Sequence, residues 1–443
     1  MNASSDVRAV EEGLAPRATR SRYGVIGFAV AVAGLTYIDR ICISKAEPFI
    51  VKEFRLEPWQ MGWVFFAFGA GYALFEVPGG WLGDRIGARK VLTRIVLWWS
   101  LFTAATGWAW SFFSLVGTRF LFGVGEAGAF PNIARALKTW LPEHERVRAQ
   151  SLVWLSARWG GAFTPFLVVF LLDHMPWRAI LYIFGGLGVL WSILFYRWYR
   201  DNPRDLKSAN QAELALIEGS GGAPAEQAGP TPWKAMFTSR TVWLLCFQYF
   251  CLAYAWIFYG TWLPRYLVDV LHVDGKWGAF LNAFPLFLGG IGCLVSPFIL
   301  NAVIRRTASV RTGRRMMGCI GFGAASLLLL LSFYLKNPFW AMVAMGFASF
   351  ANDFVMPVSW AAAMDVGGRH TGTLAGVMNM ASAVGGSLAP LLTGYLLSRP
   401  GGWQLNFWIS AVVYLVGLCC WLFIDPVTPL VKDVDAKPEG ALA

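Results

Sequence analysis

Long apolar stretches recur along this sequence, and they restrict it to a membrane fold. Hydrophobic residues make up 56% of the 443 residues and charged residues only 14%, whereas charged residues are about a quarter of a soluble domain. A helix needs about 20 apolar residues to cross the roughly 30 Å hydrocarbon core of a bilayer. Stretches of at least about 18 residues begin near positions 23, 60, 91, 113, 150, 178, 241, 277, 315, 338, 371 and 404. The sequence therefore predicts an all-α polytopic membrane protein with about twelve transmembrane helices.

A polar segment from about Asp201 to Arg240 divides these stretches into two groups of six. It contains Gly-Ser-Gly-Gly-Ala-Pro at 219–224, a composition typical of a flexible linker. We therefore expect two six-helix halves. The expected divisions are an N-terminal tail at 1–21, a first half at 22–200, a linker at 201–239, a second half at 240–425 and a C-terminal tail at 426–443.

The distribution of positive charge predicts the orientation. When the loops are assigned alternately to two sides, the side with both termini receives about 25 of the 37 Lys and Arg residues and the other side about 8. Both termini are therefore expected in the cytoplasm, with the protein crossing the inner (cytoplasmic) membrane many times. The net charge of +11 would suit nucleic acid, but the basic residues are scattered singly through short loops. We expect the lipid bilayer as a partner and no nucleic acid.

Cysteine and histidine usage gives no sign of a metal or cofactor site. Nearly all of the seven cysteines lie inside apolar runs, without Cys-x-x-Cys spacing or histidine partners. No pairing of a nucleophile with a base and no group of metal ligands is found at membrane depth. We therefore expect no metal, no cofactor and no enzymatic activity.

Charged residues within the predicted spans indicate ion or substrate handling. A charge at membrane depth costs about 2.5 to 3.5 kcal/mol even on the gentler insertion scales, so such residues are usually functional. Asp39 adjoins Arg40 and is expected to supply its counter-charge. Arg119 and Glu126 lie about two turns apart along one helix face, so both can point into one cavity. The charged residues at membrane depth are the acids Asp39, Glu76, Glu126 and Asp353 and the bases Arg40, Arg94, Arg119 and Arg158.

The second half has fewer buried charges and more aromatic and amide groups. Such groups bind hydroxyls better than they bind charges. They predict that the second half contacts the hydroxyl groups of a substrate. The residues expected to do so are Tyr254, Tyr259, Asn352, Ser359 and Asn379.

The loop between the second and third predicted spans carries a specific motif. It reads Gly-Trp-Leu-Gly-Asp-Arg-Ile-Gly-Ala-Arg-Lys at 80–90 and resembles the signature loop of the major facilitator superfamily. This resemblance implies the major facilitator fold, with two related six-helix halves. An acid followed by several bases at a helix end can clamp two helices in one conformation and release them in another. We expect Asp84, Arg85 and Arg89 to form such a clamp.

Within that superfamily, residues 22–425 resemble the anion:cation symporter family, which includes bacterial sugar-acid transporters and the sialin and vesicular glutamate transporter branches. The resemblance rests on the runs at 37–40, 119–132, 261–267 and 365–380. It implies that Asp39 and Glu126 carry coupling protons, that Arg40 and Arg119 face the substrate anion, and that Tyr72 and Asn379 lie nearby. In the bacterial sugar-acid members Glu76 would be Gln and Arg158 uncharged, so the mechanism is more transferable than the substrate.

These observations predict proton-coupled symport of a small organic anion by alternating access, carried out by a monomer. The expected substrate is a sugar acid, such as a hexonate, a hexuronate or an aldarate, with Arg158 as a further contact. When a substrate anion takes over an arginine, the partner carboxylate loses its counter-ion and accepts a proton more readily. By linkage, protonation then favours substrate binding by the same factor. Glu76 and Asp353 are further candidates for carrying the proton.

Several alternatives stay open at this point. The carrier is alternatively uncoupled, an exchanger of organic anions, or a sodium-coupled transporter of phosphate or another anion. A membrane sensor that binds its ligand without moving it is a remote alternative. Individual residues also have structural interpretations. Arg119 and Glu126 can pair to join helices, Glu76 and Arg158 can neutralise each other, and Asp353 can satisfy backbone groups near Pro357.

Overall fold

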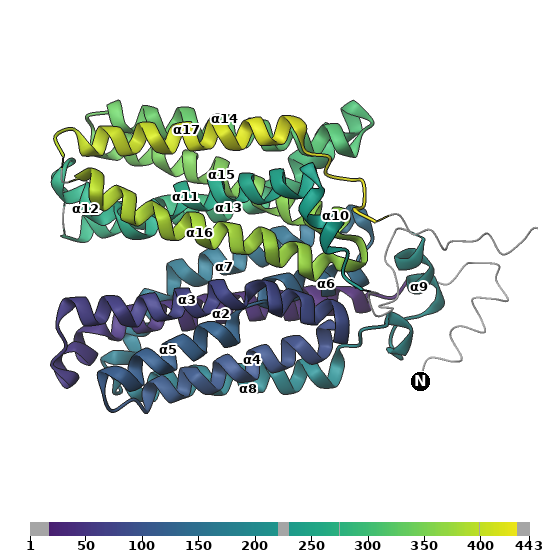
Figure 1. Cartoon of the computed structure of the whole chain (residues 1–443), viewed down its shortest axis with the longest axis horizontal. Coiled ribbons are helices and arrows are strands. Elements are labelled where there is room, and N and C mark those ends of the chain that lie inside the picture. Colours follow the sequence, from purple (N-terminus) through teal and green to yellow (C-terminus); the bar gives the residue numbers. More distant parts are fainter. Residues whose placement is uncertain (1–16, 220–229, 274, 398, 432–443) are drawn as a thin grey trace, which may run out of the picture.

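Two bundles of helices lie side by side, with the start of α2 and the end of α17 at the same end of the molecule (Figure 1). The computed structural model describes residues 17–219, 230–273, 275–397 and 399–431. We call the end at which α2 begins and α17 finishes the terminal side, and the other end the opposite side. The first bundle contains α2 (Ser21–Phe54), α3 (Pro58–Ile86), α4 (Ala88–Gly107), α5 (Phe112–Glu126), α6 (Ala129–Trp140), α7 (Glu143–Leu172) and α8 (Trp177–Trp198).

The second bundle follows a connecting segment on the terminal side. That segment contains η1 (Pro203–Asp205), α9 (Gln211–Glu218) and α10 (Trp233–Thr238). The described residues contain no strand, so the all-α prediction is confirmed. The bundle itself consists of α11 (Arg240–Thr261), α12 (Leu263–Asp269), α13 (Gly275–Thr307), α14 (Val310–Tyr334), α15 (Pro338–Gly367), η2 (Gly368–His370), α16 (Thr371–Leu397) and α17 (Gly402–Phe423).

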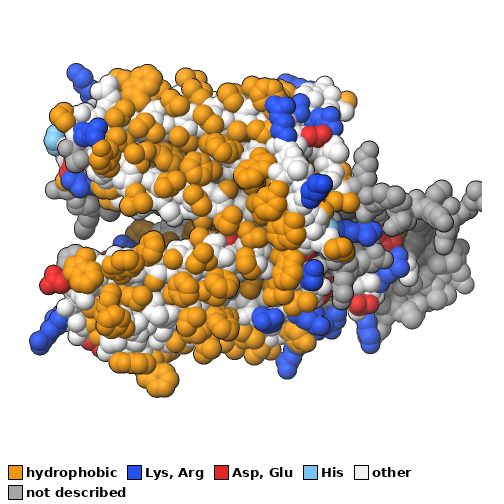
Figure 2. All heavy atoms as spheres, in the orientation of Figure 1, with side chains coloured by type: hydrophobic (Ala, Val, Ile, Leu, Met, Phe, Trp, Pro, Cys, Tyr) orange, Lys and Arg blue, Asp and Glu red, His pale blue; other side chains and the backbone are white. Residues whose placement is uncertain are grey.

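The helices have the lengths and surfaces of membrane spans. Within the described residues, nine segments are long and apolar enough to cross a bilayer, and one of them, Pro338–Leu397, contains both α15 and α16. The remaining expected spans correspond to α4, whose first turns are basic, and to the short helices α5 and α6. Figure 2 shows hydrophobic side chains covering the middle of the molecule and Lys and Arg at its ends. This surface suits a lipid environment, and the polytopic fold is confirmed.

The domain divisions stay a prediction, although α8 ends at Trp198 and α11 begins at Arg240. The two bundles touch through α3 and α6 against α16 and through α7 against α13 and α15. Residues 1–16, 220–229 and 432–443, which include most of both expected tails and part of the expected linker, lie outside the described residues.

The span expected from about residue 113 is broken into α5 and α6. Ala127 has an extended backbone and Gly128 has φ 80°, a left-handed conformation that glycine adopts without strain. The break leaves the backbone N–H of Gly128 without a helical partner, and it donates to the Glu76 carboxylate at 3.0 Å. A negative charge at the start of α6 also complements the helix dipole. Glu76 on α3 therefore stabilises the break in the neighbouring helix.

Close packing between α3 and α5 depends on glycine. A Cβ atom at Gly123 would lie 2.2 Å from the carbonyl oxygen of Phe68, and one at Gly71 would lie 2.4 Å from that of Phe120. Small residues let helices in membranes approach at backbone distance, which increases van der Waals contact. This approach places Glu126 at the end of α5 beside α3 and the core of the first bundle.

We predict that Gly123→Ala destabilises the protein. The added methyl group collides with backbone rather than with a movable side chain, and overpacking of this kind costs about 1–3 kcal/mol. The matched control is Gly117→Ala on the same helix, where a Cβ atom would meet nothing within 4 Å. The apparent melting temperature of the purified protein in detergent should fall for Gly123→Ala only. Equal melting temperatures for the two variants would contradict the packing argument.

Candidate functional site

A cavity of about 260 Å³ lies between the two bundles. In the space-filling view a notch separates the bundles at the opposite side, whereas they touch at the terminal side (Figure 2). Among the described residues that line the cavity, the charged ones are both arginines. The lining residues that contribute polar, charged or aromatic side chains are Tyr37, Arg40, Tyr72, Phe130, Trp154, Arg158, Tyr249, Trp256, Asn379, Ser382 and Ser387.

Arg40 on α2 is the first cation of the cavity wall. Its Nε forms an ion pair with Glu126, which is fully buried at the end of α5. The guanidinium lies 4.6 Å from the centre of the Tyr72 ring. Its Nη2 is buried, and the Tyr72 hydroxyl lies close enough to the guanidinium to interact with it. Arg40 therefore lines the cavity although it already has a counter-charge.

The pairing of charges in the first bundle differs from the expected one. Adjacent helical residues point in different directions, so Asp39 does not pair with Arg40. Glu126 pairs with Arg40 instead, so the alternative in which Arg119 and Glu126 simply pair is not the arrangement found. Asp39 is buried and has the Trp99 side chain as its polar neighbour. Arg119 is close enough to both acids for electrostatic interaction, and its guanidinium lies 4.3 Å from the Phe122 ring centre.

Arg158 on α7 is the second cation of the cavity wall. It binds Asp353 of α15 through two hydrogen bonds, Nε to Oδ2 at 2.7 Å and Nη2 to Oδ1 at 2.9 Å. The Asn352 side-chain amide also donates to Asp353 Oδ1 at 2.9 Å. This pair joins the two bundles. The expected neutralisation of Glu76 by Arg158 is therefore wrong, and Asp353 is held by side chains rather than by backbone near Pro357.

Glu76 takes part in a second polar contact between the bundles. The side-chain amide of Asn379, on α16, donates to Glu76 Oε1 at 2.7 Å and to the Tyr72 hydroxyl at 2.8 Å. The other Glu76 oxygen accepts the Gly128 N–H. Glu76 is fully buried and does not line the cavity, whereas Tyr72 and Asn379 do.

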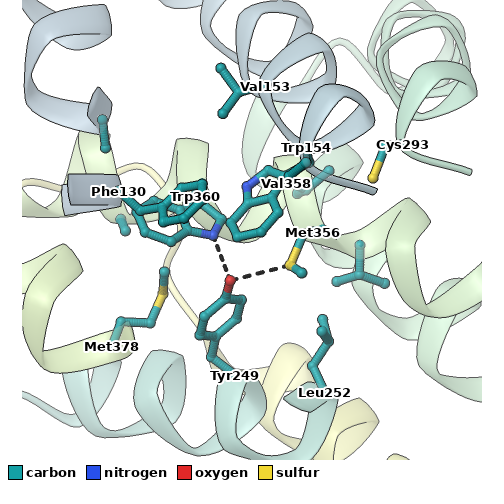
Figure 3. Close-up of a cluster of buried hydrophobic side chains, with 14 of the residues drawn as sticks. Phe130, Val153, Trp154, Tyr249, Leu252, Cys293, Met356, Val358, Trp360 and Met378 are labelled. Atoms are coloured by element: carbon teal, nitrogen blue, oxygen red, sulfur yellow. Dashed lines mark hydrogen bonds between the residues drawn. The ribbon is translucent and has the colours of Figure 1, made fainter. Parts of the chain in front are cut away.

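Aromatic side chains from both bundles pack together at the cavity wall (Figure 3). Phe130 and Trp154 of the first bundle stack with ring centres 4.7 Å apart. Trp360 of the second bundle lies 5.7 Å from the Trp154 ring centre, and its indole N–H donates to the Tyr249 hydroxyl at 2.7 Å. The Tyr249 hydroxyl in turn donates to the sulfur of Met356 at 3.2 Å. These side chains form a layer that reaches across both bundles, which we call the aromatic floor.

Asp84 joins the bundles beyond this aromatic floor. Its buried carboxylate accepts hydrogen bonds from the backbone N–H groups of Gly372 and Thr373, at 2.9 and 2.6 Å, and from the Thr373 hydroxyl at 2.6 Å. Arg135 on α6 donates to the same carboxylate at 2.7 Å. Asp84 on α3 therefore holds the start of α16, as expected for a clamp.

The other two expected clamp residues do not reach the second bundle. Arg85 lies over the Trp81 ring, and Arg89 donates to the backbone oxygen of Tyr196 at 3.0 and 2.6 Å. Both contacts stay within the first bundle, where Arg89 joins α4 to α8, and the clamp role of these two bases stays a prediction.

Other basic residues cross the interface instead, and the sequence analysis missed them. Asp365, at the end of α15, forms ion pairs with Arg146 of α7 and with Arg314 of α14, the latter at 2.6 Å. Arg135 also donates to the backbone oxygen of Arg369 at 3.1 Å. The run Asp-Val-Gly-Gly-Arg at 365–369, directly after a long apolar span, was the available signal.

Several residues expected to contact substrate do not line the cavity. Asn352 is occupied by Asp353 and accepts from the Tyr414 hydroxyl at 3.1 Å, and Ser359 donates to the side-chain oxygen of Gln248 at 3.2 Å. Helical periodicity alone does not tell which polar residue of a long helix faces a cavity and which packs between helices. The expected contacts that lie outside the cavity lining are Arg119, Tyr254, Tyr259, Asn352 and Ser359, and the lining residues that were missed include Tyr37, Trp154 and Tyr249.

Comparison with known proteins identifies the family. Residues 29–390 match the Major Facilitator Superfamily. The chain belongs to the major facilitator superfamily. It is 33% identical over 423 residues to a probable sulfoacetate transporter of Cupriavidus necator, covering 95% of this chain and 97% of that protein. It is 29% identical to a D-galactonate transporter of Escherichia coli, covering 92% and 96%, and 26% identical to a hexuronate transporter of Bacillus subtilis, covering 96% and 98%.

A solved structure supports the same assignment of fold. The proton:xylose symporter XylE, bound to 6-bromo-6-deoxy-D-glucose, superimposes with a TM-score of 0.72 at 14% identity, covering 92% of this chain and 97% of that one. The fold of this chain is therefore that of a multi-pass transporter of the superfamily. The resemblance to the anion:cation symporter family is confirmed by the curated relatives, whose names are those of anion transporters.

We predict that Arg40→Ala strongly weakens anion binding. The guanidinium offers charge-assisted hydrogen bonds of about 1.5–3 kcal/mol each, so affinity should fall at least about tenfold. Arg40→Lys should restore little, because an ammonium group does not reproduce the planar fork of donors. Arg265→Ala, which removes an exposed cation paired with Asp269, is the control. Binding is measured by calorimetry on the purified protein, and near-normal affinity in Arg40→Ala would contradict the assignment.

We predict that Asp84→Ala opens the terminal side. The change removes the acceptor of Arg135, Gly372 and Thr373, and each lost bond to a charged group is worth about 1.5–3 kcal/mol. Spin labels at the exposed positions Lys90 and Arg306, on a background without reactive cysteines, should move apart in pulsed electron-resonance distance measurements. Glu218→Ala, which removes a surface ion pair with Arg204, should leave the distance unchanged. An unchanged distance in Asp84→Ala would show that the other contacts suffice for closure.

Proposed function

We propose that this protein takes up a small organic anion together with protons, by alternating access. The observation that carries the proposal is the ion pair between Arg40, on the cavity wall, and Glu126, buried behind it. A substrate carboxylate that enters the cavity competes with Glu126 for the same guanidinium. Glu126 then loses its counter-charge in an apolar region and gains free energy by binding a proton.

The balance of buried charges supports coupling to protons. With every group ionised, the membrane region holds one more negative than positive charge among the residues that bear on the cavity. An added anion increases this imbalance in a medium where unpaired charges cost several kcal/mol each. Proton uptake by the acids offsets the added charge, so binding of substrate and of protons favour each other. The groups concerned are Arg40, Arg119, Arg158, Asp39, Glu76, Glu126 and Asp353.

The cavity lining supports a sugar acid as the substrate. Asn379, Ser382 and Ser387 of α16, together with Tyr249 of α11, offer amide and hydroxyl groups beside the arginines. Hydroxyl groups of a substrate need such partners when they leave water. Relatives named as transporters of D-galactonate, hexuronate and galactarate or D-glucarate agree with a hexonate, a hexuronate or an aldarate. The name of the sulfoacetate relative widens the class to other small organic acids.

The closure of one side agrees with one state of an alternating-access cycle. The Asp84 contacts and the aromatic floor close the terminal side, whereas the notch between the bundles lies at the opposite side. With both termini in the cytoplasm of an inner membrane, as the charge distribution predicts, the cavity faces outward. We propose that one chain suffices, because the cavity lies within one chain and is lined by both of its bundles. No catalytic step is part of this proposal.

Glu126→Gln should separate coupling from binding. Glutamine imitates the protonated acid in shape and cannot titrate, so the variant should bind substrate with affinity that no longer depends on pH. In reconstituted vesicles a proton gradient should no longer drive accumulation. Exchange of substrate for substrate needs no change of protonation and should persist. Glu218→Gln, which alters an exposed acid of α9, is the control and should accumulate substrate as the parent does.

The same vesicles distinguish the alternatives. Accumulation by Glu126→Gln under an inward proton gradient, at the level of the parent protein, would show that Glu126 is only a structural partner of Arg40. Accumulation that requires a sodium gradient, or uptake that never exceeds equilibrium in the parent protein, would replace proton symport with one of the other carrier mechanisms.

A further inference from the structure

We propose that the preferred substrate carries two acidic groups, one bound by Arg40 and the other by Arg158. This inference rests on the proposed function and adds a class of substrate to it. The partners that it implies are dicarboxylates, or carboxylates with a sulfonate or phosphonate at the other end. A molecule with one acid and a neutral opposite end would use only one of the two arginines.

The charge of the cavity lining is the first argument. Both charged residues of the described lining are arginines, and the carboxylates that pair with them, Glu126 and Asp353, do not line the cavity. A ligand therefore meets two cations directly and meets the acids only behind them. A substrate with two negative charges matches such a surface better than one with a single charge.

Both cations line the same cavity, and Tyr37 of the cavity wall lies near each of them. The Arg40 guanidinium lies 5.5 Å from the centre of the Tyr37 ring, and Tyr37 also lies within electrostatic range of Arg158. The two arginines therefore flank one aromatic residue of the cavity wall. With a cavity volume of about 260 Å³, just below the usual range of drug-sized pockets, a short diacid fits better than a large one.

The geometry of the Arg158–Asp353 pair allows a substrate acid to replace Asp353 as the partner of Arg158. Its two hydrogen bonds to Asp353 use Nε and Nη2, which leaves Nη1 for a ligand, and Trp256 of the cavity wall covers the guanidinium at 4.0 Å. A purely structural contact at this depth would be served as well by apolar side chains, because buried ion pairs seldom add stability over them. On the cavity wall, however, the pair can exchange Asp353 for a substrate acid.

Displacement of Asp353 has a consequence for the two bundles. Arg158 belongs to α7 and Asp353 to α15, so a substrate acid that takes over Arg158 removes one contact between the bundles. Asp353 stays held by the Asn352 amide after it loses Arg158. A diacid thereby acts on both arginine pairs at once, whereas a monoacid acts on the Arg40 pair alone.

Two matched pairs of probes test the inference. Gluconate and glucarate differ only in whether the sixth carbon is an alcohol or a carboxylate, and isethionate and sulfoacetate differ in the same way at one end. On the full-length protein in detergent, the diacid of at least one pair should bind about 10- to 100-fold tighter than its monoacid, as expected for one additional charge-assisted contact. Equal affinities within both pairs, or no binding of any of the four, would overturn the inference.

Variants of the second arginine pair sharpen the test. Arg158→Gln should reduce the ratio of diacid to monoacid affinity to about 1, because only the second contact is lost. Asp353→Asn should raise the ratio above that of the parent protein, because Arg158 loses its competing acid while it keeps its charge. A purely structural pair would instead lower both affinities together in both variants. The Asp353→Asn result keeps the inference falsifiable if Arg158→Gln fails to fold.

These binding experiments can fail or succeed independently of the transport experiments that test the proposed function. A strong preference for the diacid without proton-driven accumulation would leave the second acid subsite standing and remove the coupling mechanism. Proton-driven accumulation of monoacid and diacid with equal affinity would leave the coupling mechanism standing and remove the second acid subsite.

Discussion

The free-energy cost of burying a charge away from water determines how the charged side chains of this protein are paired. Every arginine on the cavity wall has a carboxylate behind it, because an unpaired guanidinium or carboxylate at this depth would cost several kcal/mol. The partner comes from another helix in each case, α5 for Arg40 and α15 for Arg158. The same constraint that fixes the helices therefore leaves the cavity with cations that an anionic ligand can share with the acids behind them.

Polar contacts also account for how the two bundles can hold together and still separate. The recorded polar links at the interface, such as those of Asp84 to the start of α16, Asp365 to Arg146 and Asn379 to Glu76, are hydrogen bonds and ion pairs. Water or a substrate can replace such partners at modest cost, since the net value of each bond is small. Within the first bundle, by contrast, Gly123 brings α5 against the backbone of α3, where no comparable exchange is available.

The sequence predicted the parts of this structure that depend on length and composition. Twelve apolar stretches, their division into halves and the depth of residues such as Asp39 and Arg158 follow from the cost of burying polar groups. It did not predict which charges pair, because partners on different helices are set by the packing of the bundle. Asp39 is adjacent to Arg40 in sequence, yet Glu126, from another helix, is the partner of Arg40. The break at Gly128 was hidden for a similar reason, since Glu76, on another helix, stabilises it.

The distribution of charge between the bundles bears on how substrate binding reaches the rest of the protein. In the described membrane region the arginines and most acids belong to the first bundle, and Asp353 is the acid that the second bundle contributes near the cavity. Exchange of partners at Arg40 occurs entirely within the first bundle and leaves the interface intact. Exchange at Arg158 breaks a contact between bundles. A ligand that acts on both arginines therefore links occupancy of the cavity to the freedom of one bundle to move against the other.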